Sequence, residues 1–431
     1  MHEQQYPERV EGSEPRPRLV YITPALGFLT VLIDGFDTQS VAFAGPFLKR
    51  EFASGGSALG MIFGLGMTGG LIGAFVLGPL GDKFGRRPLI IASLLLMAIG
   101  SILSAYASTV MEVAIFRLLA GIGFGGAVPT VLALVAECAA PKRRSLTIAI
   151  VFNGFPLGGM LGSIVGAQFL PAHGWRAFFT LGAVLPAVLL MLVVFLLPES
   201  RQVLARTEAR RAVRSEQTCP GEHSDAVEGG FLQRFGQLFA GDLRHITVLL
   251  WLGTFLSVLS LYCTVNFLPT LMSEAGIPMG TAIRSIAALN LGSVIGGIIL
   301  ARFADRSSPY LPTAVFYMLG GLTLAAIAAP IYSSAAILSL AFLGGLLAFG
   351  AQLSLTAITT RAYPVPVKST GIGFSHGVAR IGGAVGPFVA GILLDLGGGF
   401  AMFMTGIGVM FVLAGVVVLM LRHVAPVRFG A

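Results

Sequence analysis

The sequence predicts an all-α membrane protein whose twelve transmembrane helices form two pseudo-symmetric six-helix bundles. Of its 431 residues, 55% are hydrophobic and only 11% are charged, whereas soluble domains carry about 25% charged residues. The apolar residues form runs long enough to cross a bilayer, and one long polar segment divides these runs into six and six. Similar short charged motifs also occur at corresponding positions of the two halves.

The predicted spans follow from the length of the apolar runs. A helix needs roughly 20 apolar residues to cross a hydrocarbon core of about 30 Å. Runs of that length are expected to form helices at 21–45, 58–80, 88–107, 112–136, 146–169, 176–197, 245–268, 281–303, 311–331, 334–360, 368–392 and 399–421. The 57 glycines agree with this prediction, because small residues let membrane helices approach closely.

The polar segments divide the chain into five parts. They are a tail at 1–20, a first bundle at 21–197, a cytoplasmic linker at 198–244, a second bundle at 245–421 and a tail at 422–431. Lys and Arg accumulate in cytoplasmic segments of membrane proteins. With both termini cytoplasmic, the inside segments hold 22 Lys and Arg and the outside loops hold three. The sequence therefore predicts a multi-pass protein of the bacterial cytoplasmic (inner) membrane with both termini inside.

Several functional classes are disfavoured by what the sequence lacks. We expect no cleavable signal peptide, and the sequence shows no P-loop, no Ser/His/Asp order and no metal-ligand spacing around the three scattered cysteines. We therefore expect no catalytic residue, no metal and no cofactor other than a proton gradient. The net charge of +8 predicts contact with anionic lipid head groups and not with nucleic acid, and a monomer is expected.

Two acidic side chains stand out in the first span, which reads "LIDGFDTQS" around Asp34 and Asp37. Ionisable groups inside membrane spans usually mark a route for substrate or ions. A spacing of three residues puts both carboxylates on one helix face, where their repulsion favours protonation of one of them. We interpret the pair as a proton-coupling site; the alternative is a structural pair that caps a kink at Gly35.

Two buried arginines lie at depths comparable to those of the aspartates. At about 1.5 Å per residue, Asp34 and Arg380 both lie roughly 20 Å from the cytoplasmic side, and Arg117 lies nearer the depth of Asp37. Arg380 is the predicted clamp for a substrate carboxylate, because a guanidinium binds carboxylates bidentately and stays charged. Arg117 is predicted to take part in proton coupling. His376, one turn before Arg380, is a second candidate for binding the anion or relaying a proton. The alternatives are a salt bridge between helices for Arg380, helix packing for Arg117 and a packed neutral imidazole for His376.

Three further side chains are predicted to line the substrate cavity. Gln352 and Asn266 are polar residues in the middle of spans, and Phe36 is an aromatic side chain beside the aspartates. For the amides the alternative is a hydrogen bond to a neighbouring helix, and for Phe36 it is ordinary packing.

The loops "GPLGDKFGRRP" after the second span and "ARFADRSSP" after the eighth carry the charged motifs that repeat between the halves. Charged pairs at these helix ends would hold the two bundles together on the cytoplasmic side and break when that side opens. The predicted gate residues are Asp82, Arg86 and Arg87 in the first half and Asp305 and Arg306 in the second. The alternative role of the basic residues is anchoring on the cytoplasmic side.

The first of these loops resembles the signature of the major facilitator superfamily. The pattern Gly78-x-x-x-Asp82-x-x-Gly85-Arg86-Arg87 agrees with that signature almost position for position. "RLLAGIGFGG" in the fourth span and "LPESR" after the sixth also resemble motifs of the superfamily. The resemblance covers the whole chain and implies alternating-access transport, with Gly78 and Gly85 as part of the gate motif.

Within that superfamily the chain resembles the aromatic acid:proton symporter family. Its first span carries the acidic pattern "DGFDTQ", and "VPTVLALVAECAAPKRR" and "YPVPVKSTGIGFSHGVARIGGAVGP" resemble the family's fourth and eleventh spans. Two departures are Thr130, where Asn is common, and "VPV" after Tyr-Pro, where an acidic residue is usual. The resemblance implies proton-coupled import of a hydroxybenzoate-like or benzoate-like acid.

Two other transport functions stay open at this point. One is proton-coupled transport of another organic anion, muconate-like or quinate-like. The other is drug:proton antiport, which is disfavoured because Phe155 interrupts the Gly-Pro pattern that such antiporters carry in the fifth span.

Overall fold

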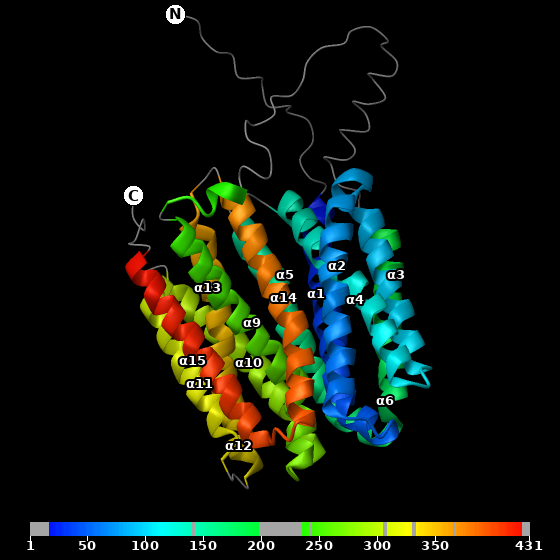
Figure 1. The fold of residues 1–431 in the computed structure, drawn as a ribbon. Coiled ribbons are helices and arrows are strands. Elements are labelled where there is room, and N and C mark those ends of the chain that lie inside the picture. The colour runs from blue at the N-terminus through cyan, green and yellow to red at the C-terminus, as the bar shows by residue number, and fades with distance from the viewer. Residues whose placement is uncertain are drawn as a thin grey trace, which may run out of the picture.

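The computed structural model describes residues 17–139, 143–197, 235–241, 243–304, 308–329, 333–364 and 367–424. In this part of the chain every regular element is helical (Figure 1). The helices of the first half are α1 (Pro17–Glu51), α2 (Gly56–Phe84), α3 (Arg86–Ala105), α4 (Val110–Cys138), α5 (Arg144–Phe152) and α6 (Gly154–Leu196). Those of the second half are α9 (Leu243–Glu274), α10 (Met279–Ala304), α11 (Tyr310–Ala326), α12 (Ser334–Gly344), the π-helical turn Gly345–Phe349, α13 (Gly350–Ala362), α14 (Lys368–Asp395) and α15 (Phe400–Val424).

The described helices account for the twelve predicted crossings. α6 contains most of the fifth crossing and all of the sixth, because the chain reverses direction at Gly174, which has a φ of 77°. α5 and the first part of α6 together make the fifth crossing, and α12, the π-helical turn and α13 together make the tenth. Nine described segments are long and apolar enough to span a bilayer, among them the doubled segment 146–196, and α1 and the shorter α11 complete the set. The predicted all-α membrane fold is confirmed.

The helices pack as two bundles that meet along three helix pairs. Contacts between the bundles join α2 to α14, α6 to α10 and α1 to α9. We call the side on which α6 ends and α9 begins the linker side. In Figure 1, α2 and α14 lie together at the lower end and diverge toward the linker side at the top. The packing of Gly60 against Pro387 and of Gly64 against Phe388 marks the region where these two helices touch.

Matching glycine-mediated crossings occur in the two bundles. A Cβ atom on Gly125 of α4 would lie 1.9 Å from the carbonyl oxygen of Gly70 in α2. A Cβ atom on Gly296 of α10 would lie 1.8 Å from the carbonyl oxygen of Leu346 in the π-helical turn. In each half, therefore, the second and fourth crossings touch backbone to backbone, which supports a structural repeat.

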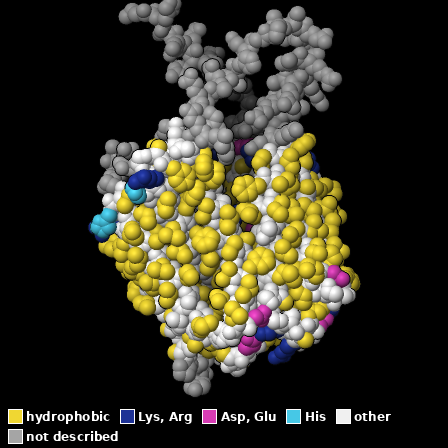
Figure 2. Space-filling view, viewed as in Figure 1, with side chains coloured by type: hydrophobic (Ala, Val, Ile, Leu, Met, Phe, Trp, Pro, Cys, Tyr) yellow, Lys and Arg dark blue, Asp and Glu magenta, His cyan; other side chains and the backbone are white. Residues whose placement is uncertain are grey.

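The outer surface is that of a membrane protein. Figure 2 shows hydrophobic side chains over the whole middle zone of this face, with charged side chains confined to its upper and lower margins. Large apolar side chains such as Phe75, Phe195 and Leu322 are exposed. Such a belt is stable in lipid and would aggregate in water.

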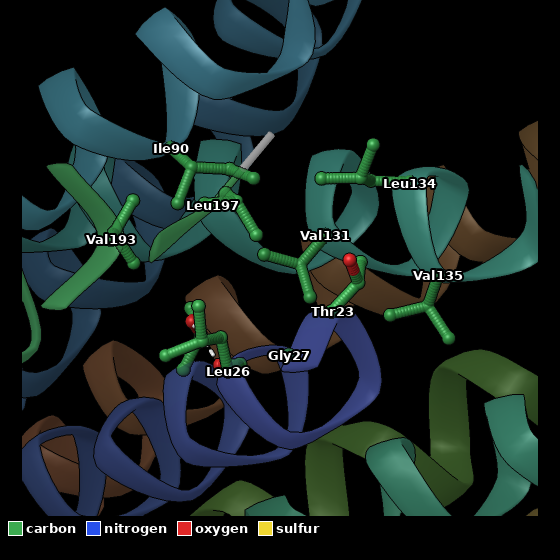
Figure 3. A pocket seen from close by; sticks show the side chains of 10 residues that line it. Thr23, Leu26, Gly27, Ile90, Val131, Leu134, Val135, Val193 and Leu197 are labelled. Atoms are coloured by element: carbon green, nitrogen blue, oxygen red, sulfur yellow. Dashed lines mark hydrogen bonds between the residues drawn. The ribbon is translucent and has the colours of Figure 1, made fainter. Parts of the chain in front are cut away.

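A small apolar cavity lies inside the first bundle (Figure 3). Its lining side chains come from α1, α3, α4 and α6 and from Leu197, which follows α6; they are Thr23, Leu26, Gly27, Thr30, Ile90, Val131, Leu134, Val135, Val193 and Leu197. This lining contains no charged group, so the cavity offers nothing to an anion. The ionisable residues lie elsewhere.

Candidate functional site

Asp37 and Arg117 form an ion pair in the interior of the first bundle. Asp37 is fully buried and Arg117 is 2% exposed. An Nη1 of Arg117 donates to Oδ2 of Asp37 at 3.2 Å. The guanidinium carbon lies 4.7 Å from the centre of the Phe179 ring. The structure thus places together two of the three predicted proton-coupling residues, which come from α1 and α4.

Two serines of α3 complete this ion pair. Ser101 donates to Oδ1 of Asp37 at 2.9 Å and accepts from Nη2 of Arg117 at 2.9 Å. Ser104 accepts from Nε of Arg117 at 2.9 Å. A buried ion pair is tolerated only when its remaining donors and acceptors are satisfied. The sequence analysis missed both serines, although their spacing of three residues on an apolar span is a signal that could have found them.

Asp34 belongs to a second electrostatic cluster that includes both bundles. It is 6% exposed, and Thr38 donates to its Oδ1 at 3.2 Å. The charge of Arg380 on α14 acts on the carboxyl of Asp34 and on the Tyr262 hydroxyl of α9. Acid, base and phenol from three helices therefore interact through their charges, with no ion pair or hydrogen bond between them among the described residues.

Arg380 connects α14 to α2. Its Nη1 donates to the carbonyl oxygen of Gly70 at 2.8 Å. In the described part of the chain no carboxylate lies within ion-pairing distance of Arg380. This hydrogen bond to a backbone carbonyl leaves the charge of the half-buried guanidinium uncompensated, so the side chain can bind an anion.

His376 and Arg380 face the space between the bundles. At about 100° per residue, both lie on the side of α14 that is turned away from its exposed apolar side chains Ile381, Val385 and Ile392. His376 is exposed, and its Nδ1 lies 2.9 Å from the carbonyl oxygen of Ile372. Its exposure on this face indicates that the space between the bundles is open on the linker side.

A cavity between the bundles adjoins the Asp37–Arg117 pair. It is lined by Asp37, Thr38, Val41, Ile62, Phe63, Gly66, Met67, Arg117, Phe124 and Asn266. Asn266 of α9 is 2% exposed, and its Nδ2 has no hydrogen-bond partner among the described residues. The structure thus places the predicted cavity residue Asn266 on the wall of this cavity.

The other mid-membrane amides hold helices together. Oε1 of Gln352 accepts from the Tyr317 hydroxyl at 3.0 Å and from the Ser257 hydroxyl. These contacts join α13 to α11 and α9 within the second bundle. Gln39 and Asn290, which the sequence analysis missed, bind each other from α1 and α10, with Nδ2 of Asn290 donating to Oε1 of Gln39 at 2.8 Å.

Phe36 does not join the other predicted substrate residues. It is 4% exposed and its ring centre lies 5.5 Å from that of Phe178, inside the core of the first bundle. Its direction differs from that of Asp34 and Asp37 because neighbouring residues of a helix point to different faces. We therefore leave Phe36 out of the proposed site.

The predicted gate motif of the first half lies at the junction of α2 and α3. Gly85 has a φ of 109°, a conformation that favours glycine. Nε of Arg86 donates to Oε1 of Glu137 at 2.8 Å, and Nη2 of Arg87 donates to the carbonyl oxygen of Val194 at 2.5 Å. Both contacts stay within the first bundle. A Cβ atom on Gly78 would meet no atom within 4 Å.

Three of the predicted gate side chains are not seen. Asp82 belongs to α2, but its side chain lies outside the described residues, as do Asp305 and Arg306 altogether. The cross-bundle latch on the linker side therefore stays a prediction.

On the opposite side the bundles are held together by contacts that the sequence analysis missed. Asp395, at the end of α14, accepts from the backbone N–H of Gly56 at 2.5 Å and of Ser57 at 2.9 Å. It therefore caps the first turn of α2 in the other bundle. Lys49 pairs with Glu274, which links the ends of α1 and α9.

We expect Asp395→Asn to weaken closure on the opposite side. A carboxylate at a helix N-terminus contributes up to about 1 kcal/mol at an exposed site, so the ratio of open to closed conformers should rise about fivefold. The distance between spin labels at Ser108 and Gly399, one on each bundle on that side, would measure this ratio. In Asp395→Asn a larger fraction of molecules should show the long distance of the open conformer. Glu51→Gln is the matched control, since Glu51 bonds Trp175 and Arg176 within the first bundle. An unchanged distance distribution would show that the cap does not hold the bundles together.

Comparison with known proteins agrees with this architecture. The chain matches the family model of the Major Facilitator Superfamily over residues 27–364 and 250–429. It is 32% identical to a gallate transporter of Pseudomonas putida, over 92% of this chain and 91% of that protein. It is 31% identical to the 4-hydroxybenzoate transporter PcaK of Acinetobacter baylyi, over 91% of this chain and 88% of that protein.

Solved structures show the same fold. A bacterial homolog of the human lysosomal transporter Spinster, in an inward-facing and unoccupied conformation, superposes with a TM-score of 0.74 at 16% identity, covering 96% of this chain and 98% of that one. A D-xylose-proton symporter superposes with a TM-score of 0.70 at 17% identity, covering 93% and 97%. The chain belongs to the Major Facilitator Superfamily and, within it, to the aromatic acid:proton symporter family.

Proposed function

We propose that this membrane transporter imports an aromatic carboxylate together with protons. The observation that carries the proposal is the position of Arg380. This cation lies within a membrane-spanning helix where the bundles meet, and it donates a hydrogen bond to the Gly70 carbonyl of the other bundle. Ionisable groups at such depth usually mark a substrate route, and a guanidinium suits a carboxylate.

The relatives support an aromatic substrate. Those at about 30% identity over most of the chain include proteins named as transporters of gallate, 4-hydroxybenzoate and benzoate. The cavity beside Asn266 has a volume of about 30 Å³ and does not enclose a ring, but Phe63 and Phe124 on its wall offer aromatic surface against which the ring edge of such an acid can pack.

Proton coupling is assigned to the two aspartates of α1. Asp34 shares a neighbourhood with Arg380, so binding of a substrate anion at Arg380 changes the electrostatic balance on that carboxyl. Asp37 is held by Arg117 within one bundle, so its protonation would release the guanidinium. Each event links proton uptake to a rearrangement between or within bundles.

The orientation rests on the distribution of basic residues. We infer that the linker side is cytoplasmic, because the Lys and Arg residues outside the spans gather in segments on that side. The protein then lies in a bacterial inner membrane with both termini inside. Opening on the linker side releases substrate to the cytoplasm.

Arg380→Gln is the variant that tests the substrate site. Losing a charge-assisted hydrogen bond costs about 1.5–3 kcal/mol, so the KM for 4-hydroxybenzoate should rise about tenfold to a hundredfold. The measurement is uptake of radiolabelled 4-hydroxybenzoate into proteoliposomes with and without an imposed inward proton gradient. Arg284→Gln is the matched control, because Arg284 is an exposed arginine in the first two turns of α10, on the side opposite the linker.

Two results would contradict the proposal. Uptake that is insensitive to the gradient would exclude proton coupling. Failure of wild type to move any aromatic acid, together with expulsion of a lipophilic cation, would favour drug:proton antiport.

A further inference from the structure

We propose that Asn266 selects for a hydroxyl group on the part of the substrate ring farthest from the carboxylate. The inference rests on the proposed function and identifies a specificity-determining residue within it. Its starting point is a side-chain amide of α9. The Nδ2 atom of Asn266 is buried and lacks a hydrogen-bond partner among the described residues, although it lies in a membrane-spanning helix.

An unpaired amide at this depth needs a functional explanation. A buried donor without an acceptor is destabilising, and the surrounding lipid offers none, so a partner can come only from the cavity that the amide lines. The other mid-membrane amides described above are bonded, Gln352 to Ser257 and Tyr317, and Gln39 to Asn290. Asn266 differs from them in lining the cavity between the bundles. Its donor is therefore available to a molecule that enters the cavity.

The charges around the cavity orient that molecule. Asp37 lies on the cavity wall, and the Arg117 beside it has Nε, Nη1 and Nη2 all engaged by Asp37, Ser101 and Ser104. A substrate carboxylate next to Asp37 would meet a like charge and find no free cation. The carboxylate therefore belongs at Arg380, and only a small uncharged substituent of the ring belongs in the cavity.

Arg380 and the cavity wall lie at different depths along α2. Arg380 bonds the carbonyl of Gly70, and the cavity wall includes Gly66, one turn of α2 farther from the linker side. One helical turn rises about 5.4 Å. The cavity has a volume of about 30 Å³, which holds a hydroxyl group and not a ring. The ring therefore lies between Arg380 and the cavity, with its carboxylate at Arg380 and a meta or para substituent directed at Asn266.

A ring hydroxyl has the chemistry that this end of the cavity requires. Its oxygen accepts from Nδ2 of Asn266, and its O–H can donate to Thr38 or to a carboxylate on the wall. A methyl group of similar size leaves Nδ2 unpaired. Sites that bond a substrate hydroxyl discriminate strongly against analogues that lack it.

The experiment compares substrate analogues in wild type and in Asn266→Leu. The inhibition constants of 4-hydroxybenzoate, 4-methylbenzoate and 2-hydroxybenzoate are measured by competition against radiolabelled benzoate bound to purified protein. Wild type should bind 4-hydroxybenzoate about tenfold more tightly than 4-methylbenzoate, the effect of roughly one hydrogen bond. Asn266→Leu should abolish that difference and leave the affinity for 2-hydroxybenzoate unchanged.

Two controls separate this role from a structural one. Met67→Leu alters the same cavity wall without changing a hydrogen bond, so it should keep the tenfold preference. Thermal unfolding of Asn266→Leu should show no loss of stability, since the variant removes an unpaired polar group.

The outcomes distinguish this inference from the proposed function. An equal preference in wild type and Asn266→Leu overturns the role of Asn266 while transport of aromatic acids stands. Failure of wild type to bind any of these acids overturns the proposed function, and the inference with it.

Discussion

Replacing Asp37 by asparagine is expected to lower the free energy of unfolding by about 3–5 kcal/mol, and replacing Arg117 by glutamine is expected to do the same. Each change leaves the opposite partner charged in a site where Asp37 is fully buried and Arg117 is 2% exposed. The double variant Asp37→Asn with Arg117→Gln removes both charges. It should recover most of the lost stability, because two neutral amides can bond each other and the two serines.

Function should not recover with stability. Asparagine at position 37 cannot bind and release a proton, and in Arg117→Gln the guanidinium that protonation of Asp37 would release is missing. Gradient-driven uptake should therefore be absent from both single variants and from the double. Stability is measured by denaturation in mixed micelles and uptake in proteoliposomes, and the two data sets form a double-mutant cycle. Stability of Asp37→Asn equal to that of wild type would show that the pair is not ionised in the folded state. Uptake by the double variant would remove the pair from proton coupling.

The fold and the pairing of charges were largely predictable from the sequence. Span positions follow from apolar length alone, because lipid requires every crossing to satisfy its backbone internally. The ion pair of Asp37 with Arg117 followed from counting depth along helices, since residues at one depth on neighbouring helices are within reach of each other. The same count placed Arg380 at the depth of Asp34, whose carboxyl feels its charge without forming an ion pair.

The depth of a residue in the membrane does not say toward which neighbouring helix or cavity its side chain points. Phe36 lies between the two aspartates in the sequence and points into the bundle core, whereas Asn266 points into the cavity. The sequence also does not show which groups a residue at a helix end contacts in the other bundle. Nothing in the residues around Asp395 indicates that its carboxylate reaches the first turn of α2, because that contact depends on how the two bundles are docked. Sequence distance carries no information about such contacts.

Gly125→Ala is expected to cost about 3 kcal/mol or more of stability, at or beyond the upper end of ordinary overpacking. The new Cβ would lie 1.9 Å from the carbonyl oxygen of Gly70 and 2.7 Å from its carbonyl carbon. Backbone atoms cannot move aside as a flexible side chain does, so α2 and α4 must separate. Gly406→Ala is the control, because a Cβ there meets no atom within 4 Å. That change should be neutral or stabilise the helix by about 0.5–1 kcal/mol.

The same substitution also tests how the substrate site is supported. The Gly70 carbonyl that Gly125→Ala would displace is the acceptor that holds Arg380 at 2.8 Å. Gly296→Ala makes the corresponding clash in the second bundle, 1.8 Å from the carbonyl oxygen of Leu346. Both variants should therefore lose similar stability, whereas only Gly125→Ala should weaken the binding of 4-hydroxybenzoate by the protein that stays folded. Equal affinities in the two variants would mean that the position of Arg380 is set by α14 alone and not by its contact with α2.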